Sequence, residues 1–210
     1  MTITRIQQTK RGRYSVTVDG EFWCALHGDA YYQSGLREGQ EVTPRQLEEI
    51  RLQSDTRLAV EKAARILSHA ANTSRQLYDK LRRSVDERAA AAAVERMLEL
   101  GYLDDEDYAR RLAADLVHLK GYGPRRVAET LRQKGLTQEQ IQQAVDSLGE
   151  EDSEERLCRL LERKYARYLG DGKGLRRTVN SLLRMGYSYG EIRQAINRYT
   201  QWEGEEDPSL

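Results

Sequence analysis

Four consecutive acidic residues, Asp104 to Asp107, are of the type that binds metal ions or transfers protons. Adjacent residues on a helix point about 100° apart, however, so four in a row do not converge on one ion. No histidine or cysteine near them completes a ligand set. Asp104 instead suits the N-cap of a helix, and the three following carboxylates suit the positive end of its dipole. We therefore interpret the acidic run as a helix start.

The segment "KGYGPRR", residues 120–126, is a second candidate because a glycine-rich approach to a helix N-terminus can hold phosphate. It matches neither of the phosphate-binding patterns GxGxxG and GxxxxGK[ST]. Gly123 suits an N-cap and Pro124 the first helical position, so an inter-helix loop is favoured.

Catalytic groups are not predicted from the remaining reactive side chains. His27, His69 and His118 are isolated, and no nucleophile, base and acid share a recognisable spacing. Cys24 and Cys158 lie far apart and belong to no CxxC or Cys/His cluster, which favours two free thiols. We predict a non-enzymatic protein with no cofactor and no metal ion.

Positive charge is the stronger signal, although 34 basic and 34 acidic residues cancel overall. The segment between Arg156 and Tyr199 contains eleven Lys/Arg and only three acids. An "RR" pair recurs at Arg125–Arg126 and Arg176–Arg177. Solvated helix faces with pairs such as Arg125 and Glu129 are the plain alternative. A basic stripe would instead meet DNA phosphates or an acidic protein surface, and the sequence leaves both open. The candidate binding surface comprises Arg75, Arg82, Arg83, Tyr122, Arg125, Arg126, Arg132, Lys134, Arg176, Arg177 and Arg184.

Tyrosine side chains could add stacking contacts to single-stranded DNA. Tyr102, Tyr108, Tyr187 and Tyr199 fall at apolar-periodic or helix-boundary positions, where core packing is favoured. Tyr122, between two glycines, is the better candidate for an exposed contact.

The elements that position these residues begin with a small β-rich module, residues 1–42. Two β-rich runs surround Asp19-Gly20, a strong hairpin signal, and "TRIQQT" could add an edge strand. A short helix and a turn should follow in "DAYYQSGLREGQEV". A long helix is expected from Thr43, which has capping-box spacing to Gln46, towards Ala70, with a break near "QSDT".

The rest of the chain predicts helical repeats, over residues 43–101, 102–150 and 151–200, followed by an acidic tail, 201–210. "GPRRVAETLRQKGLTQEQIQQAV" and "GLRRTVNSLLRMGYSYGEIRQAI" align without gaps. Three-helix units are expected, with capping boxes at Ser84/Glu87, Thr137/Gln140 and Ser188/Glu191 and left-handed glycines at 101, 135 and 186. Tyr108, Leu112, Leu116 and Leu119 form one apolar stripe. The fold class predicted is mainly α: three tandem three-helix repeats in an elongated arch, with an N-terminal β-hairpin module.

No apolar run follows Met1, and no stretch of about 18 apolar residues occurs. We expect a soluble, cytoplasmic monomer that does not enter a membrane.

The combination "GYLDDEDYA", an amphipathic helix and "KGYGPRRVAETLRQKGL" resembles the RecX family of RecA regulators. "TSRQLYDKL" is similar to the family's first-repeat motif, and "YYQSGLREGQEVTPRQLEEI" to the extended N-terminal form. The family often has an arginine just before the serine or threonine of the first-repeat motif, where this chain reads "SHAANTS".

This resemblance implies a protein that binds RecA and RecA–single-stranded DNA filaments, and that mostly inhibits recombinase, ATPase and coprotease activity. It implies roles in DNA repair, homologous recombination and the SOS response. A stand-alone DNA-binding protein with weak direct affinity for DNA and a passive protein-binding scaffold stay open as alternatives.

Overall fold

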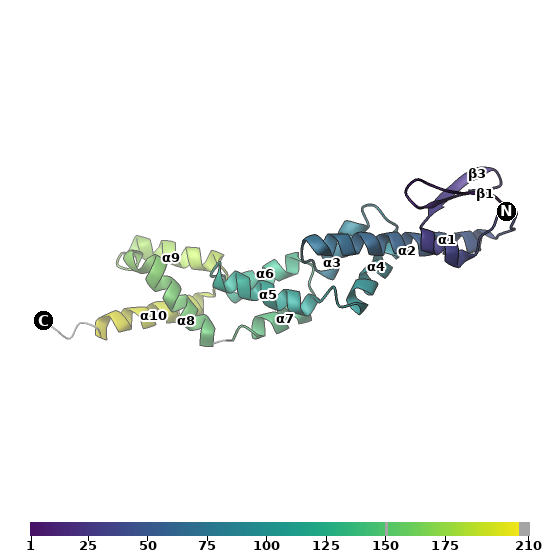
Figure 1. Cartoon of the computed structure of the whole chain (residues 1–210). Helices are drawn as coiled ribbons and strands as arrows, with labels where there is room; N and C mark the ends of the chain where they lie inside the picture. Colours follow the sequence, from purple (N-terminus) through teal and green to yellow (C-terminus); the bar gives the residue numbers. More distant parts are fainter. Residues whose placement is uncertain (150, 206–210) are drawn as a thin grey trace. The chain divides into compact units, whose positions relative to one another are not determined.

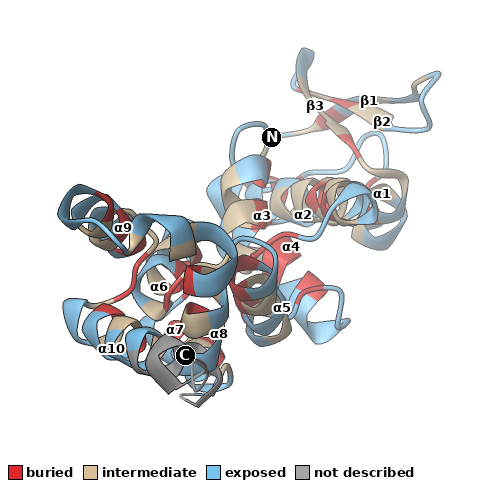
Figure 2. Ribbon diagram, turned by 90° about the vertical axis from the view of Figure 1, so that its left-hand side faces the viewer, coloured by how far each residue is buried: buried red, intermediate tan, exposed pale blue. Residues whose placement is uncertain are grey.

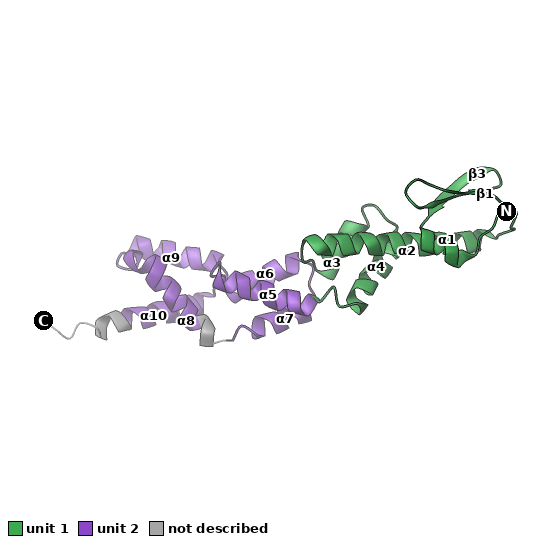
Figure 3. Ribbon diagram, viewed as in Figure 1, with its two compact units in different colours: residues 1–104 green, residues 105–210 purple. Residues whose placement is uncertain are grey.

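The structure is a computed structural model that describes residues 1–149 and 151–205, in two compact units, 1–104 and 105–210 (Figures 1 and 3). It is mainly helical, with one small antiparallel sheet at the N-terminus, as the sequence predicts. The predicted elongated arch depends on how the two units are placed relative to each other, so it stays a prediction. Within the described residues, no helix is both long and apolar enough to cross a membrane.

Unit 1 begins with a three-stranded antiparallel sheet in the order β1-β2-β3. The strands are β1 (Ile3–Gln8), β2 (Tyr14–Val18) and β3 (Glu21–Leu26). Asp19 and Gly20 link β2 to β3 with φ angles of 49° and 85°, which is the left-handed geometry that an Asp-Gly hairpin turn adopts. The predicted hairpin and edge strand are therefore confirmed.

Helix α1 (Gly28–Ser34) and the first turns of α2 (Pro44–His69) cover the sheet. Leu36, Val42 and Leu47 pack with strand residues Ile3, Val16 and Leu26 in one apolar core. Thr43 and Gln46 form the predicted capping box. These contacts tie the sheet directly to the helical part of unit 1.

The predicted break of α2 near "QSDT" is wrong, because the helix runs unbroken from Pro44 to His69. Its polar side chains at this point have partners. The buried Ser54 hydroxyl accepts the His27 N–H at 2.8 Å, and the Thr56 hydroxyl donates to the Leu52 carbonyl at 2.8 Å. Ser54 therefore docks the helix against the segment that follows β3, while Thr56 bonds within the helix, and neither residue ends it.

Helices α3 (Ser74–Leu81) and α4 (Glu87–Glu99) complete unit 1 by packing on the second half of α2. Their core is built from leucine and many alanines, including Ala59, Ala63, Leu77 and Ala93, so the helices approach closely. The capping box predicted at Ser84/Glu87 is wrong: α4 begins later, and the Asp86 carboxylate caps it by accepting the Arg88 N–H at 2.8 Å.

The first three-helix group of unit 2 comprises α5 (Asp105–His118), α6 (Pro124–Gln133) and α7 (Gln138–Asp146). Asp105, Glu106 and Asp107 occupy the first turn of α5, and Thr137 and Gln140 form the predicted capping box. Leu116 is buried in the core, but Leu119 is 80% exposed, so the predicted stripe ends before it. Tyr102, which we expected in the core, is 67% exposed.

The second group comprises α8 (Glu151–Leu160), α9 (Gly172–Arg184) and α10 (Tyr189–Glu205). A π-helical turn, η1 (Leu161–Tyr165), and a 3₁₀ turn, η2 (Ala166–Tyr168), lead from α8 towards α9. Ser188 and Glu191 exchange the two predicted capping hydrogen bonds. Residues 201–205 of the predicted acidic tail continue α10, and 206–210 lie outside the described residues.

The two groups of unit 2 meet backbone to backbone. The Gly123 N–H donates to the Met185 carbonyl at 2.8 Å, the Arg125 N–H donates to the Gly186 carbonyl at 3.3 Å, and the Tyr187 hydroxyl donates to the Gly121 carbonyl at 3.1 Å. A Cβ atom at Gly123 would lie 2.7 Å from the Gly186 carbonyl carbon. We call this contact between residues 121–126 and 185–187 the glycine junction.

We predict that Gly123→Ala lowers the free energy of unfolding by about 2 kcal/mol, because the added methyl meets backbone atoms that cannot turn aside. Gly123 has a φ of −78°, which alanine adopts without strain, so the loss reports the close approach itself. Urea unfolding followed by circular dichroism measures it. Gly190→Ala is the control: its Cβ would meet nothing closer than 3.9 Å, and we expect a gain of up to about 1 kcal/mol. Equal stability of the two variants would contradict the junction.

We predict that Tyr187→Phe costs about 1 kcal/mol near neutral pH, because the hydrogen bond to Gly121 is lost. Burial raises the pKa of Tyr187 above its ordinary value. Above about pH 10 the unfolded chain releases this proton while the folded chain keeps it, so the wild type loses stability as pH rises. The difference between the wild type and Tyr187→Phe should therefore shrink between about pH 8 and pH 11.

Urea unfolding across that pH range measures the difference, with the exposed Tyr102→Phe as control. We expect the control to change the unfolding free energy by less than about 0.5 kcal/mol. A difference between wild type and Tyr187→Phe that is constant with pH would show that the buried hydroxyl does not link stability to ionisation.

Candidate binding surface

The predicted surface residues divide between the two units. Arg75, Arg82 and Arg83 belong to unit 1, on α3 and directly after it. The other eight belong to unit 2, where Tyr122 to Lys134 surround α6 and Arg176 to Arg184 lie on α9. Within unit 2, α6 and α9 lie on one side, and α7 and α10 on the other (Figures 1 and 2).

Three of these arginines form exposed ion pairs within the chain. Arg75 pairs with Asp79 at 3.2 Å, Arg82 with Glu87 at 3.8 Å, and Arg132 with Glu129 at 2.6 Å. Exposed pairs of this kind contribute about 0–1 kcal/mol, so a partner can displace them readily. The alternative pairing of Arg125 with Glu129 does not occur, because Glu129 binds Arg132 and Gln133.

Four other arginines of the predicted surface are available to a partner. Arg125, Arg176, Arg177 and Arg184 are exposed, and none of them forms an ion pair within residues 1–149 and 151–205. Both "RR" pairs therefore present guanidinium groups to solvent. Surface arginines without partners are suited to carboxylates and phosphates, which they bind through two parallel hydrogen bonds.

Tyr122 is held by cations rather than freely exposed. The Lys120 ammonium and the Arg126 guanidinium each lie 5.8 Å from the centroid of its ring. The ring is half-buried against the core of α5, α6 and α7. Tyr122 thus orients Arg126 at the start of α6, and the glycine junction fixes that start against the loop before α10.

The two helices with "RR" pairs begin differently. Gly123 is the N-cap of α6, whereas α9 begins at Gly172, with the Asp171 carboxylate accepting the N–H groups of Lys173 and Gly174 at 2.7 and 2.6 Å. Gly174, which aligns with Gly123, lies inside the first turn of α9. Its Cβ would lie 2.2 Å from the Tyr168 carbonyl oxygen. The aligned glycines therefore allow two different close contacts.

A basic groove that the sequence analysis missed lies between the end of α5 and α8. It has a volume of about 760 Å³, and its charged lining is Lys120, Arg156, Arg159, Arg163 and Lys164, with no carboxylate among the described lining residues. We call it the α5–α8 groove. In the sequence, Arg156, Arg159 and Arg163 follow a spacing of three and four residues, which indicates one helix face. In the structure Arg156 and Arg159 lie on α8, whereas Arg163 lies on the π-helical turn η1. That periodicity was the signal available in the sequence.

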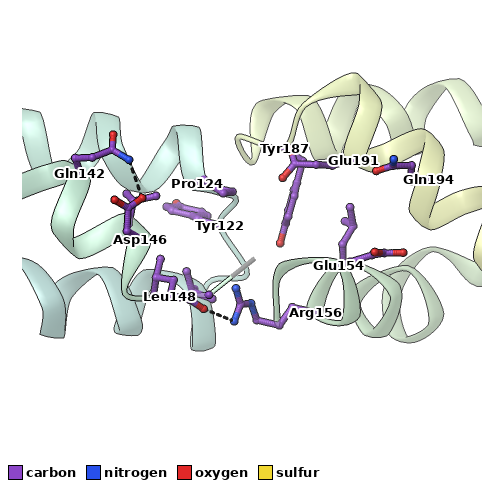
Figure 4. A pocket seen from close by; sticks show the side chains of 14 residues that line it. Tyr122, Pro124, Gln142, Asp146, Leu148, Glu154, Arg156, Tyr187, Glu191 and Gln194 are labelled. Atoms are coloured by element: carbon purple, nitrogen blue, oxygen red, sulfur yellow. Dashed lines mark hydrogen bonds between the residues drawn. The ribbon is translucent and has the colours of Figure 1, made fainter. Parts of the chain in front are cut away.

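A second depression beside the glycine junction has mixed charge (Figure 4). Its volume is about 560 Å³, and Asp146, Glu154 and Glu191 line it together with Tyr122 and Tyr187. Arg156 lines both depressions and donates to the Leu148 carbonyl at 3.4 Å. The junction thus separates a basic depression from a mixed one.

Metal-binding clusters and reactive thiols are two features that would indicate catalysis. No three His, Cys, Asp or Glu side chains in the part of the chain that the structure describes could hold a metal ion together. Both cysteines are free, and burial raises the pKa of Cys158 and raises that of Cys24 to about 12. Thiols with raised pKa values are protonated at neutral pH and are poor nucleophiles.

In unit 1, the segment "SHAANTS" places Asn72 directly before the N-cap Thr73. Asn72 is 6% exposed; its amide donates to the Ala70 carbonyl at 2.7 Å and its oxygen accepts from the Lys80 ammonium. The Lys80 ammonium therefore lies beside Asn72, the residue directly before the cap.

Comparison with known proteins identifies both groups of unit 2. Residues 104–145 match the family model of the second three-helix domain of RecX, and residues 150–196 match the model of the third. A regulatory protein RecX of Lactobacillus delbrueckii subsp. bulgaricus is 30% identical across 98% of this chain and 77% of its own length. The regulatory protein RecX of Clostridioides difficile is 26% identical across 96% and 97%.

Solved structures share the fold. A crystal structure of a regulatory protein RecX covers 92% of this chain and 98% of its own, with a TM-score of 0.69 and 22% identity. RecX from Lactobacillus salivarius covers 70% of this chain and 97% of its own, with a TM-score of 0.65 and 23% identity. By sequence along nearly its whole length, this chain belongs to the RecX family of regulatory proteins.

Proposed function

We propose that this protein regulates RecA by binding it and its filament on single-stranded DNA, and that it mostly inhibits ATP hydrolysis, strand exchange and coprotease action. The observation that carries the proposal is membership of the RecX family along nearly the whole chain. We propose that the protein acts by binding, as a cytoplasmic monomer without a cofactor.

The contact surface that we propose in unit 2 is formed by the exposed arginine pairs of α6 and α9. The glycine junction holds these helices in one unit, so both pairs meet a partner together. A filament offers acidic protein side chains and DNA phosphates, and both bind guanidinium groups. A helical protein bound to neighbouring RecA protomers would oppose filament extension and the conformational cycle that accompanies ATP turnover.

We predict that Arg176→Glu/Arg177→Glu raises the concentration needed for half-inhibition of RecA ATP hydrolysis on single-stranded DNA by at least about tenfold. Placing like charges opposite each other costs several kcal/mol in an interface, and about 1.4 kcal/mol is a factor of ten. The same substitutions should leave the fold intact, because both side chains are exposed and form no ion pair within the described residues. Titration of RecA ATPase at near-physiological salt measures the change.

Arg110→Glu/Arg111→Glu is the matched control. These residues are also an exposed adjacent pair in unit 2, but both bind Asp107 on α5, at 3.6 and 2.7 Å. The control changes the net charge by the same amount, so we expect wild-type inhibition. If both variants inhibit like the wild type, the α9 pair does not contact the filament. If both lose inhibition equally, overall charge rather than this surface governs binding.

A stand-alone DNA-binding function is the second candidate, and the α5–α8 groove favours it. Five cations line this groove without a carboxylate among the described lining residues, a charge pattern that also suits a phosphate backbone. Binding of labelled DNA without RecA at physiological salt separates the candidates. A passive scaffold would leave RecA turnover unchanged at saturating protein.

A further inference from the structure

A second basic groove lies wholly within unit 1 and joins the β module to the first helical repeat. Its volume is about 900 Å³. Three segments that are distant in sequence line it: the turn between β1 and β2, one face of α2, and the loop between α3 and α4. We call it the module groove. Its basic lining residues are Arg13, Arg51, Lys62, Arg65, Arg82 and Arg83.

One continuous face of α2 forms the floor of the module groove. The lining residues Arg51, Asp55, Leu58, Lys62 and Arg65 follow one another at alternating steps of four and three, and Glu61 of α2 also lines the groove. Residues with this spacing share one helix face over four turns. The apolar side chains of α2 that build the two cores of unit 1 leave this face free, so it has no structural role in either core.

The turn that supplies Arg13 is held in place by its own backbone. The Thr9 N–H donates to the Arg13 carbonyl at 2.7 Å, and the Arg13 N–H donates to the Thr9 hydroxyl at 3.2 Å. Gly12 supplies the left-handed residue of the turn, with a φ of 75°. Arg13 is therefore presented beside α2 by a fixed loop, and the neighbouring Lys10 and Arg11 are exposed in the same turn.

Six cations and three carboxylates line the module groove, so positive charge is in excess there. Asp55 lies 3.7 Å from Arg51, Glu61 binds the His27 ring at 3.0 Å, and Asp86 caps α4. By contrast Arg13, Arg65 and Arg83 form no ion pair within the part of the chain that the structure describes. Three guanidinium groups without an ion pair, from three different segments, thus line one groove, and Asp55 attracts Arg13 only at longer range.

The lining distinguishes between two kinds of acidic partner. Only Leu58 and Val85 among its twelve described lining residues are apolar, and no aromatic ring is among them. A stable protein interface has a largely apolar, desolvated centre, which this groove does not offer. A phosphate backbone needs only fixed cations, and arginine binds phosphate oxygens through two parallel hydrogen bonds.

From this geometry we infer that the module groove binds the phosphodiester backbone of a nucleic acid strand, independently of base sequence. The β module then has a specific role, because it supplies Arg13 as one wall of a site whose other walls belong to the first repeat. This inference does not rest on the proposed regulation of RecA, because the groove and its test involve no RecA.

The test uses the full-length protein and labelled oligothymidylate without RecA, with binding measured by fluorescence anisotropy at several salt concentrations. For Arg13→Ala/Arg65→Ala/Arg83→Ala we expect affinity to fall at least about tenfold. We also expect the slope of log K against log salt to become shallower by about 2, since each lost phosphate contact on a single strand accounts for about 0.7. All three side chains are exposed, so the variant should fold normally, which circular dichroism checks.

Arg5→Ala/Arg37→Ala/Arg45→Ala is the matched control, because it removes the same charge from exposed positions of unit 1 that do not line the groove. We expect its affinity and salt slope to stay close to those of the wild type. A triple Arg→Lys variant at positions 13, 65 and 83 should weaken binding but keep the salt slope, since the charges remain.

Three results would overturn the inference. One is no binding of oligothymidylate by the wild type, which would leave the proposed regulation of RecA untouched. Another is equal loss in the groove variant and the matched control. The third is unchanged affinity and an unchanged salt slope in the groove variant, which would show that Arg13, Arg65 and Arg83 do not contact the strand.

Discussion

Unit 2 depends on a contact between two stretches of backbone with no side chain between them. Gly123 and Gly186 allow the start of α6 to approach the loop before α10 so closely that N–H and carbonyl groups bond across the repeats. A methyl group on either glycine would fall inside the other segment. Because hydrogen bonds between backbones are directional, this junction sets the orientation of one repeat on the next as well as their separation.

The junction also explains where charge is displayed. Since backbone atoms make the central contact, the surrounding side chains are free to line depressions on either side of it. Arg156 and Tyr187 border both depressions. One of these contains the cations of α8, η1 and Lys120, and the other includes Asp146, Glu154 and Glu191. A chain with no net charge thereby presents strong local fields, and it is the local field that guides an anionic partner to its site.

Local signals in the sequence were sufficient for most elements. The Asp-Gly hairpin, the capping boxes at Thr43, Thr137 and Ser188, and the left-handed glycines at helix ends were all predicted from a few neighbouring residues, because their geometry is determined within one turn. Ser84 failed as a cap because Asp86, an equally good cap two residues later, is the one that begins α4.

Features that arise between distant segments were not predictable in this way. The module groove needs Arg13 beside Arg65 and Arg83, and the α5–α8 groove needs Lys120 beside Arg163. The arginines of the predicted surface on α3, α6 and α9 were chosen because they recur in the repeats. Recurrence does not indicate which residues of other helices lie beside them. The exposure of single residues was also not predictable from the pattern. Leu119 continues the apolar spacing of α5, but it lies directly after the last residue of the helix and is exposed.

The wrongly predicted break in α2 matters for function, because the unbroken helix joins the β module to the first repeat. A break near residues 53–56 would have separated the β module from the repeats as an appendage. Instead Leu47 packs in the core of the module and Ala59 and Ala63 pack in the core of the first repeat, so a single helix belongs to both. The face that carries Arg51, Lys62 and Arg65 stays aligned only while the helical hydrogen bonds continue through this region. A change of even one residue in the length of α2 would turn Arg65 about 100° from Arg51, and cations from the module and from the repeat would then no longer face one strand.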